Sequence, residues 1–118
     1  MIMKVYAYKN CDSCRKALKW LDERMFDVEL IPIREKPPTV VELRVAAGQL
    51  GLRKLFNTSG MDYRSLDLKN KLQNMSDHDQ LAMLASNGNL VKRPFLIDAD
   101  SDTVMVGFRA DVWQEKLG

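Results

Sequence analysis

The sequence predicts an α/β fold with a mixed four-stranded sheet. Near the N-terminus, a strand pattern, a helical pattern and a second strand pattern follow one another within about 30 residues. Near the C-terminus, two short apolar runs are followed by another helical pattern. The segment between these ends carries helical patterns only. This order of elements favours one sheet that is shared by the two ends of the chain.

The size and charge of the chain restrict its class of function. With 118 residues and a formal net charge of +2, it fits one domain and has no charge excess that would favour direct nucleic-acid binding. No apolar run approaches the roughly 18 residues of a membrane span, and the first residues lack a signal-peptide pattern. We therefore expect a cytoplasmic domain over residues 1–118 that contacts neither a membrane nor nucleic acid directly.

The N-terminal pattern predicts a strand, a helix and a second strand. Residues 2–8 alternate between two sets of side chains and are dense in strand-favouring residues. The period then becomes helical, and one helical face carries the apolar side chains of Cys14, Ala17, Leu18, Leu21 and Met25. Residues 28–33 form a second apolar run of strand length. Such a βαβ unit has parallel strands.

The middle of the chain predicts a block of helices. One helix begins after Thr39, which has capping-box spacing to Glu42, and ends at Gly51. Another begins after Ser76 and ends at Gly88. The residues between Gly51 and Ser76 predict a turn followed by short helices.

The C-terminal pattern predicts a hairpin and a final helix. Residues 95–97 and 103–106 are short apolar runs on either side of a polar turn at residues 99–102, which is typical of antiparallel strands. Residues 110–117 then predict a helix.

A parallel βαβ unit and an antiparallel ββα unit that share one mixed sheet form the thioredoxin-like arrangement. We therefore predict a thioredoxin-like core of residues 1–36 and 89–118. The helical block, at about residues 39–88, would be an insertion between its two halves.

Both cysteines lie where the first strand pattern gives way to the helical pattern. Cys11 would stand at the N-terminus of the helix, where backbone N–H groups and the helix dipole lower a thiol pKa. Two basic residues one turn further on add positive charge, whereas the carboxylate of Asp12 disfavours the thiolate. Cys14 falls on the buried face. We therefore predict that Cys11 is the nucleophile and Cys14 the resolving thiol.

Two other interpretations of the cysteine pair remain open. A closed zinc site needs four ligands, and the chain offers only these two thiols and His78, its single histidine. A zinc site would then require a second copy of the chain, so we predict no metal. Alternatively, the two cysteines are inert core residues.

Pro94 is a candidate cis proline. In thioredoxin-like folds, a cis proline before this strand faces the cysteines and presents backbone to a sulfur-bearing partner. The alternative is an ordinary trans proline at the start of an edge strand.

Four motifs, which are specific in combination, extend over nearly the whole chain: Tyr8-x-x-Cys11-x-x-Cys14-Arg15-Lys16-Ala17, Phe56-Asn57-Thr58-Ser59-Gly60-x-x-Tyr63-Arg64, Lys92-Arg93-Pro94 and Val106-Gly107-Phe108. With them the sequence resembles the family that joins glutaredoxin-dependent arsenate reductases (ArsC type) with the Spx-type regulators. The resemblance implies a thioredoxin-like fold with a helical insertion.

The resemblance also implies an anion site. In the reductases, the cysteine that matches Cys11 attacks arsenate, and three arginines hold the oxyanion. Arg64 and Arg93 match the first two, and guanidinium forks suit oxyanions. The third follows a glycine, but here Phe108 stands at that position and Arg109 comes one place later. Arg109 is the candidate for the third contact, displaced by one position from the family pattern.

Two functions follow from the resemblance. One is a thiol oxidoreductase with no bound cofactor, in which Cys11 forms an adduct or a disulfide with Cys14 or glutathione. Its electron donor would be glutathione, a glutaredoxin or a thioredoxin, and its substrate an oxyanion, a glutathione mixed disulfide or a protein disulfide. The C-x-x-C pair instead resembles the Spx regulators, where it is a redox switch and the protein binds the α subunit of RNA polymerase. A third possibility is a family member that has lost both the enzymatic and the regulatory activity and keeps only the fold.

Overall fold

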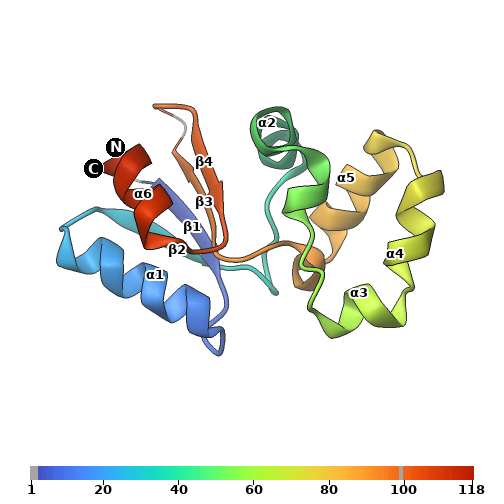
Figure 1. Cartoon of the computed structure of the whole chain (residues 1–118), viewed down its shortest axis with the longest axis horizontal. Helices are drawn as coiled ribbons and strands as arrows, with labels where there is room; N and C mark the ends of the chain where they lie inside the picture. The colour runs from blue at the N-terminus through green and yellow to red at the C-terminus, as the bar shows by residue number, and fades with distance from the viewer. Residues whose placement is uncertain (1–2, 99) are drawn as a thin grey trace. The chain divides into compact units, whose positions relative to one another are not determined.

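The computed structural model describes residues 3–98 and 100–118, and the chain divides into two compact units (Figure 1). Residues 1–32 and 93–118 form the sheet unit, and residues 33–92 form the helical unit. Ile2 and Ala99, which the sequence assigned to the first strand and to the hairpin turn, lie outside the described residues.

The sheet unit contains four strands and two helices, which are β1 (Met3–Ala7), α1 (Asp12–Glu23), β2 (Val28–Pro32), β3 (Phe95–Asp98), β4 (Thr103–Val106) and α6 (Ala110–Leu117). The strand order is β2-β1-β3-β4. β1 pairs with β2 in parallel, whereas β1–β3 and β3–β4 are antiparallel. The predicted mixed sheet of a thioredoxin-like fold is therefore confirmed.

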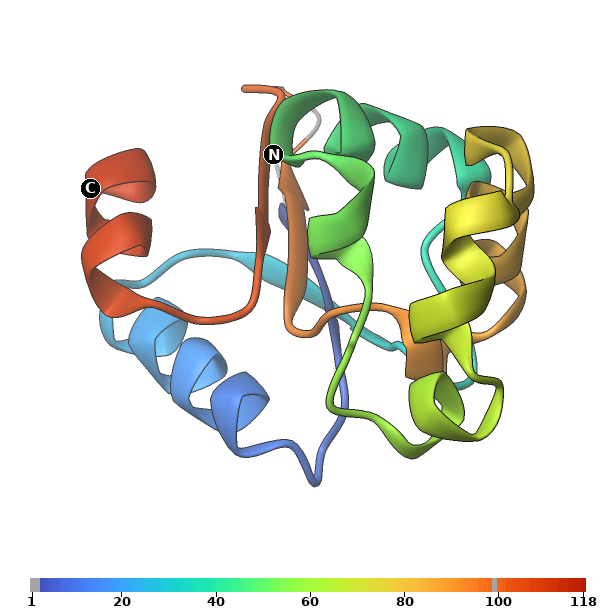
Figure 2. The same cartoon turned by 45° about the vertical axis from the view of Figure 1, so that its right-hand side comes forward.

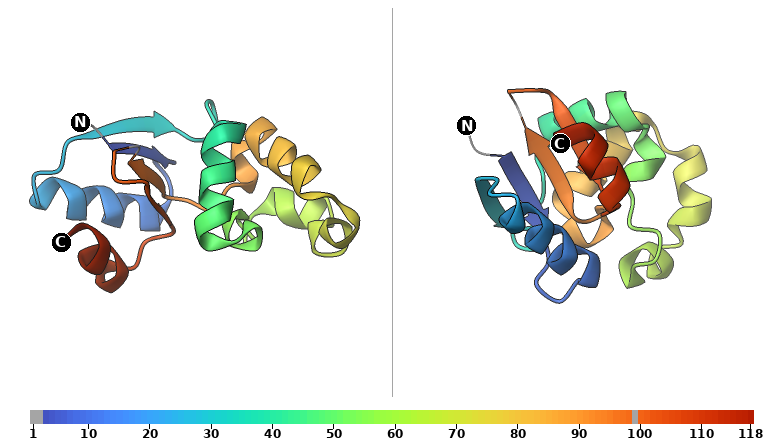
Figure 3. Two further views of the ribbon diagram at one scale, coloured as in Figure 1. Left: turned by 90° about the horizontal axis from the view of Figure 1, so that it is seen from above. Right: turned by 60° about the vertical axis from the view of Figure 1, so that its left-hand side comes forward.

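Both helices of the sheet unit cover the same face of the sheet (Figure 3). Both helices pack on β1, because its residues Met3, Val5 and Ala7 point to this face and are buried. The indole rings of Trp20 in α1 and Trp113 in α6 meet edge to face at 5.9 Å between ring centroids. Such aromatic pairs bury large apolar areas in a preferred geometry, and this pair joins the two helices.

Met25 does not lie on the buried helical face where the sequence placed it. α1 ends at Glu23, and Met25 has a φ of 62° with a side chain that is 89% exposed. The left-handed turn rotates the chain away from the helical path. Phe26 fills the space instead, since its ring stacks on Trp20 at 6.2 Å.

The helical unit contains α2 (Val40–Leu50), α3 (Met61–Ser65), α4 (Leu68–Lys71) and α5 (Asp77–Ser86), with 3₁₀ turns at η1 (Leu52–Leu55), η2 (Leu72–Asn74) and η3 (Gly88–Leu90). Thr39 and Glu42 form the predicted capping box, and Ser76 caps α5 by accepting from the N–H of Asp79. α2 packs beside α5 (Figure 2). None of the helices within residues 3–98 and 100–118 is long and apolar enough to cross a membrane.

Two stretches of the helical unit pair with each other just before the chain returns to the sheet. The N–H of Asn57 donates to the carbonyl of Leu90, and that of Lys92 donates to the carbonyl of Leu55, both at 2.7 Å. Lys92 is the last residue of the helical unit and directly precedes Arg93.

Candidate functional site

Cys11 lies between the end of β1 and the first residue of α1, and it is the N-cap of α1. Its extended backbone (φ −95°, ψ 121°) turns the side chain toward the first helical turn. The sulfur of Cys11 accepts from the N–H of Cys14 at 3.4 Å, and the N–H of Cys11 donates to the carbonyl of Tyr8 at 3.0 Å. The thiol therefore takes the place that a serine or aspartate side chain has in an ordinary N-cap.

Cys14 is fully buried beneath the first turn, and both thiols are free. The backbone N–H of Tyr8 donates to its sulfur at 3.5 Å. Burial raises the pKa of Cys14 to about 12; the hydrogen bond from Tyr8 opposes this rise, and the neighbouring Cys11 adds to it. Cys14 is therefore a protonated thiol at neutral pH.

Arg93, two residues before β3, reaches Cys11. Burial of the Cys11 thiol opposes its ionisation, but hydrogen bonds from Cys14 and the guanidinium of Arg93 outweigh this, so the pKa of Cys11 is lowered. The Arg93–Pro94 peptide bond is cis, and the carbonyl of Pro94 accepts from the N–H of Gly107 at 2.9 Å. Nη1 of Arg93 is buried and has no hydrogen-bond partner among the described residues.

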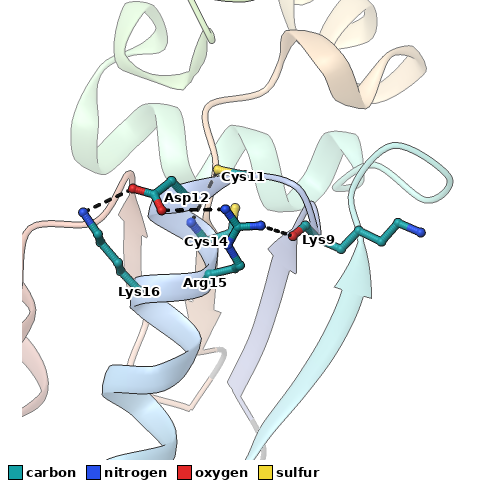
Figure 4. Close-up of polar contacts among 6 residues, drawn as sticks. All are labelled: Lys9, Cys11, Asp12, Cys14, Arg15 and Lys16. Atoms are coloured by element: carbon teal, nitrogen blue, oxygen red, sulfur yellow. Dashed lines mark hydrogen bonds and ion pairs between the residues drawn. The ribbon is translucent and has the colours of Figure 1, made fainter.

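Asp12 pairs with cations rather than facing Cys11 alone (Figure 4). Its carboxylate lies 3.2 Å from Nζ of Lys16 and 3.7 Å from Nη2 of Arg15. Nη1 of Arg15 also donates to the carbonyl of Lys9 at 3.3 Å. All of these side chains are exposed, so the pairs are weak. Arg93, not the basic residues of α1, therefore supplies the cation beside Cys11.

Phe108 and Arg109 have different environments. The Phe108 ring packs edge to face on Trp113 at 5.0 Å and on Trp20 at 6.4 Å. Arg109 is exposed at the N-cap of α6 and pairs with Asp111 at 3.6 Å. The residue after Gly107 thus joins the core of the sheet unit, whereas the next one points to solvent. The role of Arg109 as an anion contact stays a prediction.

Arg64 is exposed in α3 of the helical unit. α3 is short, and a polar network holds its first turn: Oδ2 of Asp62 accepts from Nδ2 of Asn87 at 3.0 Å and from Nδ2 of Asn89 at 3.3 Å. Nδ2 of Asn57 donates to the carbonyl of Asn89 at 3.4 Å. The network fixes α3 against η3 within the helical unit. The anion-binding role of Arg64 stays a prediction.

A model of the ArsC family matches residues 6–116 of the chain. The chain belongs to the ArsC family.

Individual relatives are similar to this chain over most of its length. The uncharacterized protein YusI of Bacillus subtilis is 46% identical over 98% of both chains. The global transcriptional regulator Spx of Enterococcus faecalis is 27% identical over 93% of this chain and 82% of the regulator.

Solved structures show the same fold. An ArsC family related protein of Bacteroides fragilis has a TM-score of 0.89 and 38% identity, and covers 98% of this chain and 97% of its own. A protein of Streptococcus mutans named as a possible arsenate reductase has a TM-score of 0.84 and 37% identity, and covers 92% of both chains.

The sheet unit of this ArsC-family protein brings Cys11, Cys14 and Arg93 together, and Pro94 follows Arg93 through a cis peptide bond. Sequence reasoning gave no role to Tyr8, although the residue is part of the first motif. The ring of Tyr8 lies under the guanidinium of Arg93, with 5.2 Å between the Arg93 guanidinium carbon and the ring centroid. The only signal in the sequence was an aromatic side chain at the end of the first strand, shortly before the cysteines.

The arrangement can support thiol chemistry. It combines one thiol of lowered pKa, a second thiol held protonated behind it, and a cation with an unused donor. Within the described residues, no group of three or more histidine, cysteine, aspartate or glutamate side chains gathers in a way that could hold a metal ion.

Proposed function

We propose that this ArsC-family protein is a thiol-dependent oxidoreductase in which Cys11 is the nucleophile. The observation that carries the proposal is that the two thiols differ in exposure and in pKa. Cys11 is half-exposed with a lowered pKa, whereas Cys14 is buried with a pKa of about 12. A thiolate is the reactive form of cysteine, so the accessible thiol is also the one that ionises more readily.

The proposed reaction with a disulfide has two steps. The Cys11 thiolate attacks one substrate sulfur, a bond forms between them, the substrate S–S bond breaks, and the released thiolate takes a proton from solvent. Cys14 then loses its proton and attacks the Cys11 sulfur, which releases the second substrate thiol. The substrate disulfide gains two electrons, and the Cys11–Cys14 dithiol is oxidised to a disulfide.

The surroundings of Cys11 support a sulfur-containing substrate over free arsenate. Disulfide exchange needs a thiolate and a resolving thiol, and Cys11 and Cys14 supply both. Arsenate would need several guanidinium groups around one oxyanion. In the sheet unit, Arg93 faces Cys11, whereas Arg109 is exposed and paired with Asp111. Arg64 is proposed as a further anion contact, and the unused Nη1–H of Arg93 would donate to an anionic group of the substrate.

The electron donors that complete the cycle would be small thiols or dithiol proteins. We propose that glutathione, a glutaredoxin or a thioredoxin reduces the Cys11–Cys14 disulfide, that no cofactor is bound, and that the protein acts in the reducing cytoplasm, where such donors are present.

Turnover of a glutathione mixed disulfide, with glutathione and glutaredoxin as donors, tests the proposal. Cys11→Ser should abolish turnover. Cys14→Ser should instead accumulate a mixed disulfide at Cys11 that mass spectrometry detects, because the resolving thiol is absent. Arsenate reduction, measured in parallel, decides between the two substrate classes.

Arg93→Gln and Arg15→Gln form a matched pair for the same assay. Arg93→Gln should slow the attack by Cys11, whereas Arg15→Gln should not, because Arg15 is exposed and pairs with Asp12. Turnover that survives in Cys11→Ser would contradict the proposal.

A second candidate is an Spx-type redox regulator, favoured by the likeness to the Enterococcus faecalis regulator and by the free C-x-x-C pair. In this case Cys11–Cys14 oxidation would change a surface that binds the α subunit of RNA polymerase. Capture of that subunit by the oxidised but not the reduced protein, without Cys11-dependent turnover, would favour the regulator over the enzyme.

A further inference from the structure

Tyr8 touches each of the groups that make up the thiol site. Its carbonyl accepts from the N–H of Cys11 at 3.0 Å, and its N–H donates to the sulfur of Cys14 at 3.5 Å. Its ring lies 5.2 Å from the guanidinium carbon of Arg93, which is within the range of a cation–π contact. The two backbone contacts do not depend on the side chain, so the ring can be changed separately.

Strand pairing explains why the ring of Tyr8 meets Arg93. In the antiparallel register of β1 and β3, Tyr6 is opposite Phe95. Continuing this register by two residues beyond the paired strands brings Tyr8 opposite Arg93. The rings of Tyr6 and Phe95 also meet, at 5.7 Å. The paired strands thus bring the segment that follows β1 and the segment that precedes β3 close together, and Tyr8 and Arg93 lie in these two segments.

Arg93 has no counter-ion within residues 3–98 and 100–118. A carboxylate would hold the guanidinium firmly, but it would also cancel the charge that favours the Cys11 thiolate. An aromatic face attracts a cation through its quadrupole and carries no net charge. It can therefore fix the position of Arg93 while the full positive charge remains available.

We propose that the ring of Tyr8 is a positioning element, which holds the Arg93 guanidinium against the Cys11 thiol without neutralising it. This inference rests on the proposed role of Arg93 as the cation that stabilises the thiolate. The orientation also leaves Nη1 of Arg93 unpartnered, so the same ring presents a donor to the substrate anion. The hydroxyl of Tyr8, which accepts from Nδ2 of Asn10 at 3.1 Å, is not needed for this function.

The pKa of Cys11, measured from its alkylation rate against pH in the whole reduced protein, tests the inference without a substrate. Tyr8→Leu removes the ring and should raise the pKa by roughly 0.5 to 1. Tyr8→Phe keeps the ring and should leave the pKa at the wild-type value. Asn10→Ala is a matched control, because it removes a hydrogen bond to the hydroxyl and leaves the ring in place.

A double-mutant cycle separates positioning from a general structural effect. Arg93→Gln should raise the pKa of Cys11 further than Tyr8→Leu does, and adding Tyr8→Leu to Arg93→Gln should then have no additional effect, because the ring acts through the guanidinium. An equal shift in both backgrounds, or no shift in Tyr8→Leu, would overturn the inference. No shift in Arg93→Gln itself would instead refute the proposed role of Arg93.

Inorganic phosphate, used as an anion probe, gives a second readout. Phosphate should slow the alkylation of Cys11 in the wild type and in Tyr8→Phe, and protection should be at least several-fold weaker in Tyr8→Leu. Equal protection in Tyr8→Leu and the wild type would contradict the presentation of Nη1 by the ring. Thermal unfolding of each variant identifies any that fail to fold.

Discussion

The backbone N–H of Cys14 points at the sulfur of Cys11, 3.4 Å away, while the sulfur of Cys14 is buried. The two cysteines of this one helical turn therefore differ in pKa. The Cys11 sulfur accepts hydrogen bonds and lies beside a guanidinium, which lowers its pKa, whereas burial away from water raises the pKa of Cys14. This inequality can be tested through the stability of the protein as well as through its chemistry.

The two thiols should give the reduced protein opposite pH dependences of stability. The pKa of Cys14 is about 12 in the folded state and about 8.5 in an unfolded chain. Between these values the unfolded state has lost a proton that the folded state keeps, so the free energy of unfolding falls as the pH rises. The pKa of Cys11 is lowered on folding. Its contribution is present above the unfolded pKa and is lost as the pH falls through the folded pKa.

Urea unfolding under reducing conditions at a series of pH values measures both effects. Cys14→Ala should remove part of the alkaline fall in stability, and Cys11→Ser should remove part of the rise that precedes it. Other groups titrate in the alkaline range, so the quantity of interest is the difference between each variant and the wild type. Identical pH dependences in all three proteins would contradict the assignment.

Phe108→Ala should destabilise the sheet unit by about 2 kcal/mol, because it removes a half-buried ring that packs on Trp113 and Trp20. Arg109→Ala, a change at the adjacent position, should alter the free energy of unfolding by less than about 0.5 kcal/mol, since its ion pair with Asp111 is exposed. Urea unfolding distinguishes the two. A larger loss at Arg109 would mean that this side chain makes a contact beyond Asp111.

Asp62→Ala should destabilise the protein by about 1 to 3 kcal/mol, because the amides of Asn87 and Asn89 would lose their acceptor. Hydrogen exchange should show faster opening of the α3 amides. Asp22→Ala, at an exposed position of α1, serves as the control and should change stability by less than about 0.5 kcal/mol. Unchanged exchange in α3 would show that the network does not hold this helix.

Two glycine-to-alanine changes should have opposite signs. An alanine at Gly88 would place its Cβ against the carbonyl of Ile33, which is backbone and cannot move aside, so we expect a loss of about 2 kcal/mol or more. At Gly48, inside α2, a Cβ would meet nothing within 4 Å. Alanine there should stabilise the protein by about 0.5 to 1 kcal/mol.

Thermal or urea unfolding measures this pair directly. The result at Gly48 also tests whether the groove beside it, which is lined by α2 and α5, is open in solution. A destabilising Gly48→Ala would contradict an open groove.

The order and type of the main elements could be predicted because local patterns decide them. The capping box of Thr39 and Glu42 and the N-cap of Ser76 involve residues three positions apart, so the sequence alone specifies them. The prediction that Met25 is buried was wrong, because the helical spacing of apolar residues in the sequence continues past the residue where the helix ends. The left-handed turn at Met25 and the stacking of Phe26 on Trp20 are what end the helical path, and neither can be read from the spacing.

The candidate site could be predicted only in part. The spacing of Cys11 and Cys14 and their place before a helix are local, so their unequal roles could be proposed from sequence. The sequence could not predict which of Phe108 and Arg109 joins the core, because that depends on contacts with indole rings from two separate helices. The ring of Tyr8 was missed for a similar reason, since its partner is far away in the chain.

The sequence by itself determined the spacing of the two cysteines, their place between a strand and a helix, and the caps of the helices. Each of these features depends on residues a few positions apart. Only the tertiary structure decided how acidic each thiol is. Burial sets the pKa of Cys14, and the pairing of β1 with β3 brings Arg93 to Tyr8 and Cys11. These contacts join distant parts of the chain, and a guanidinium favours a thiolate only when the fold holds the two side by side.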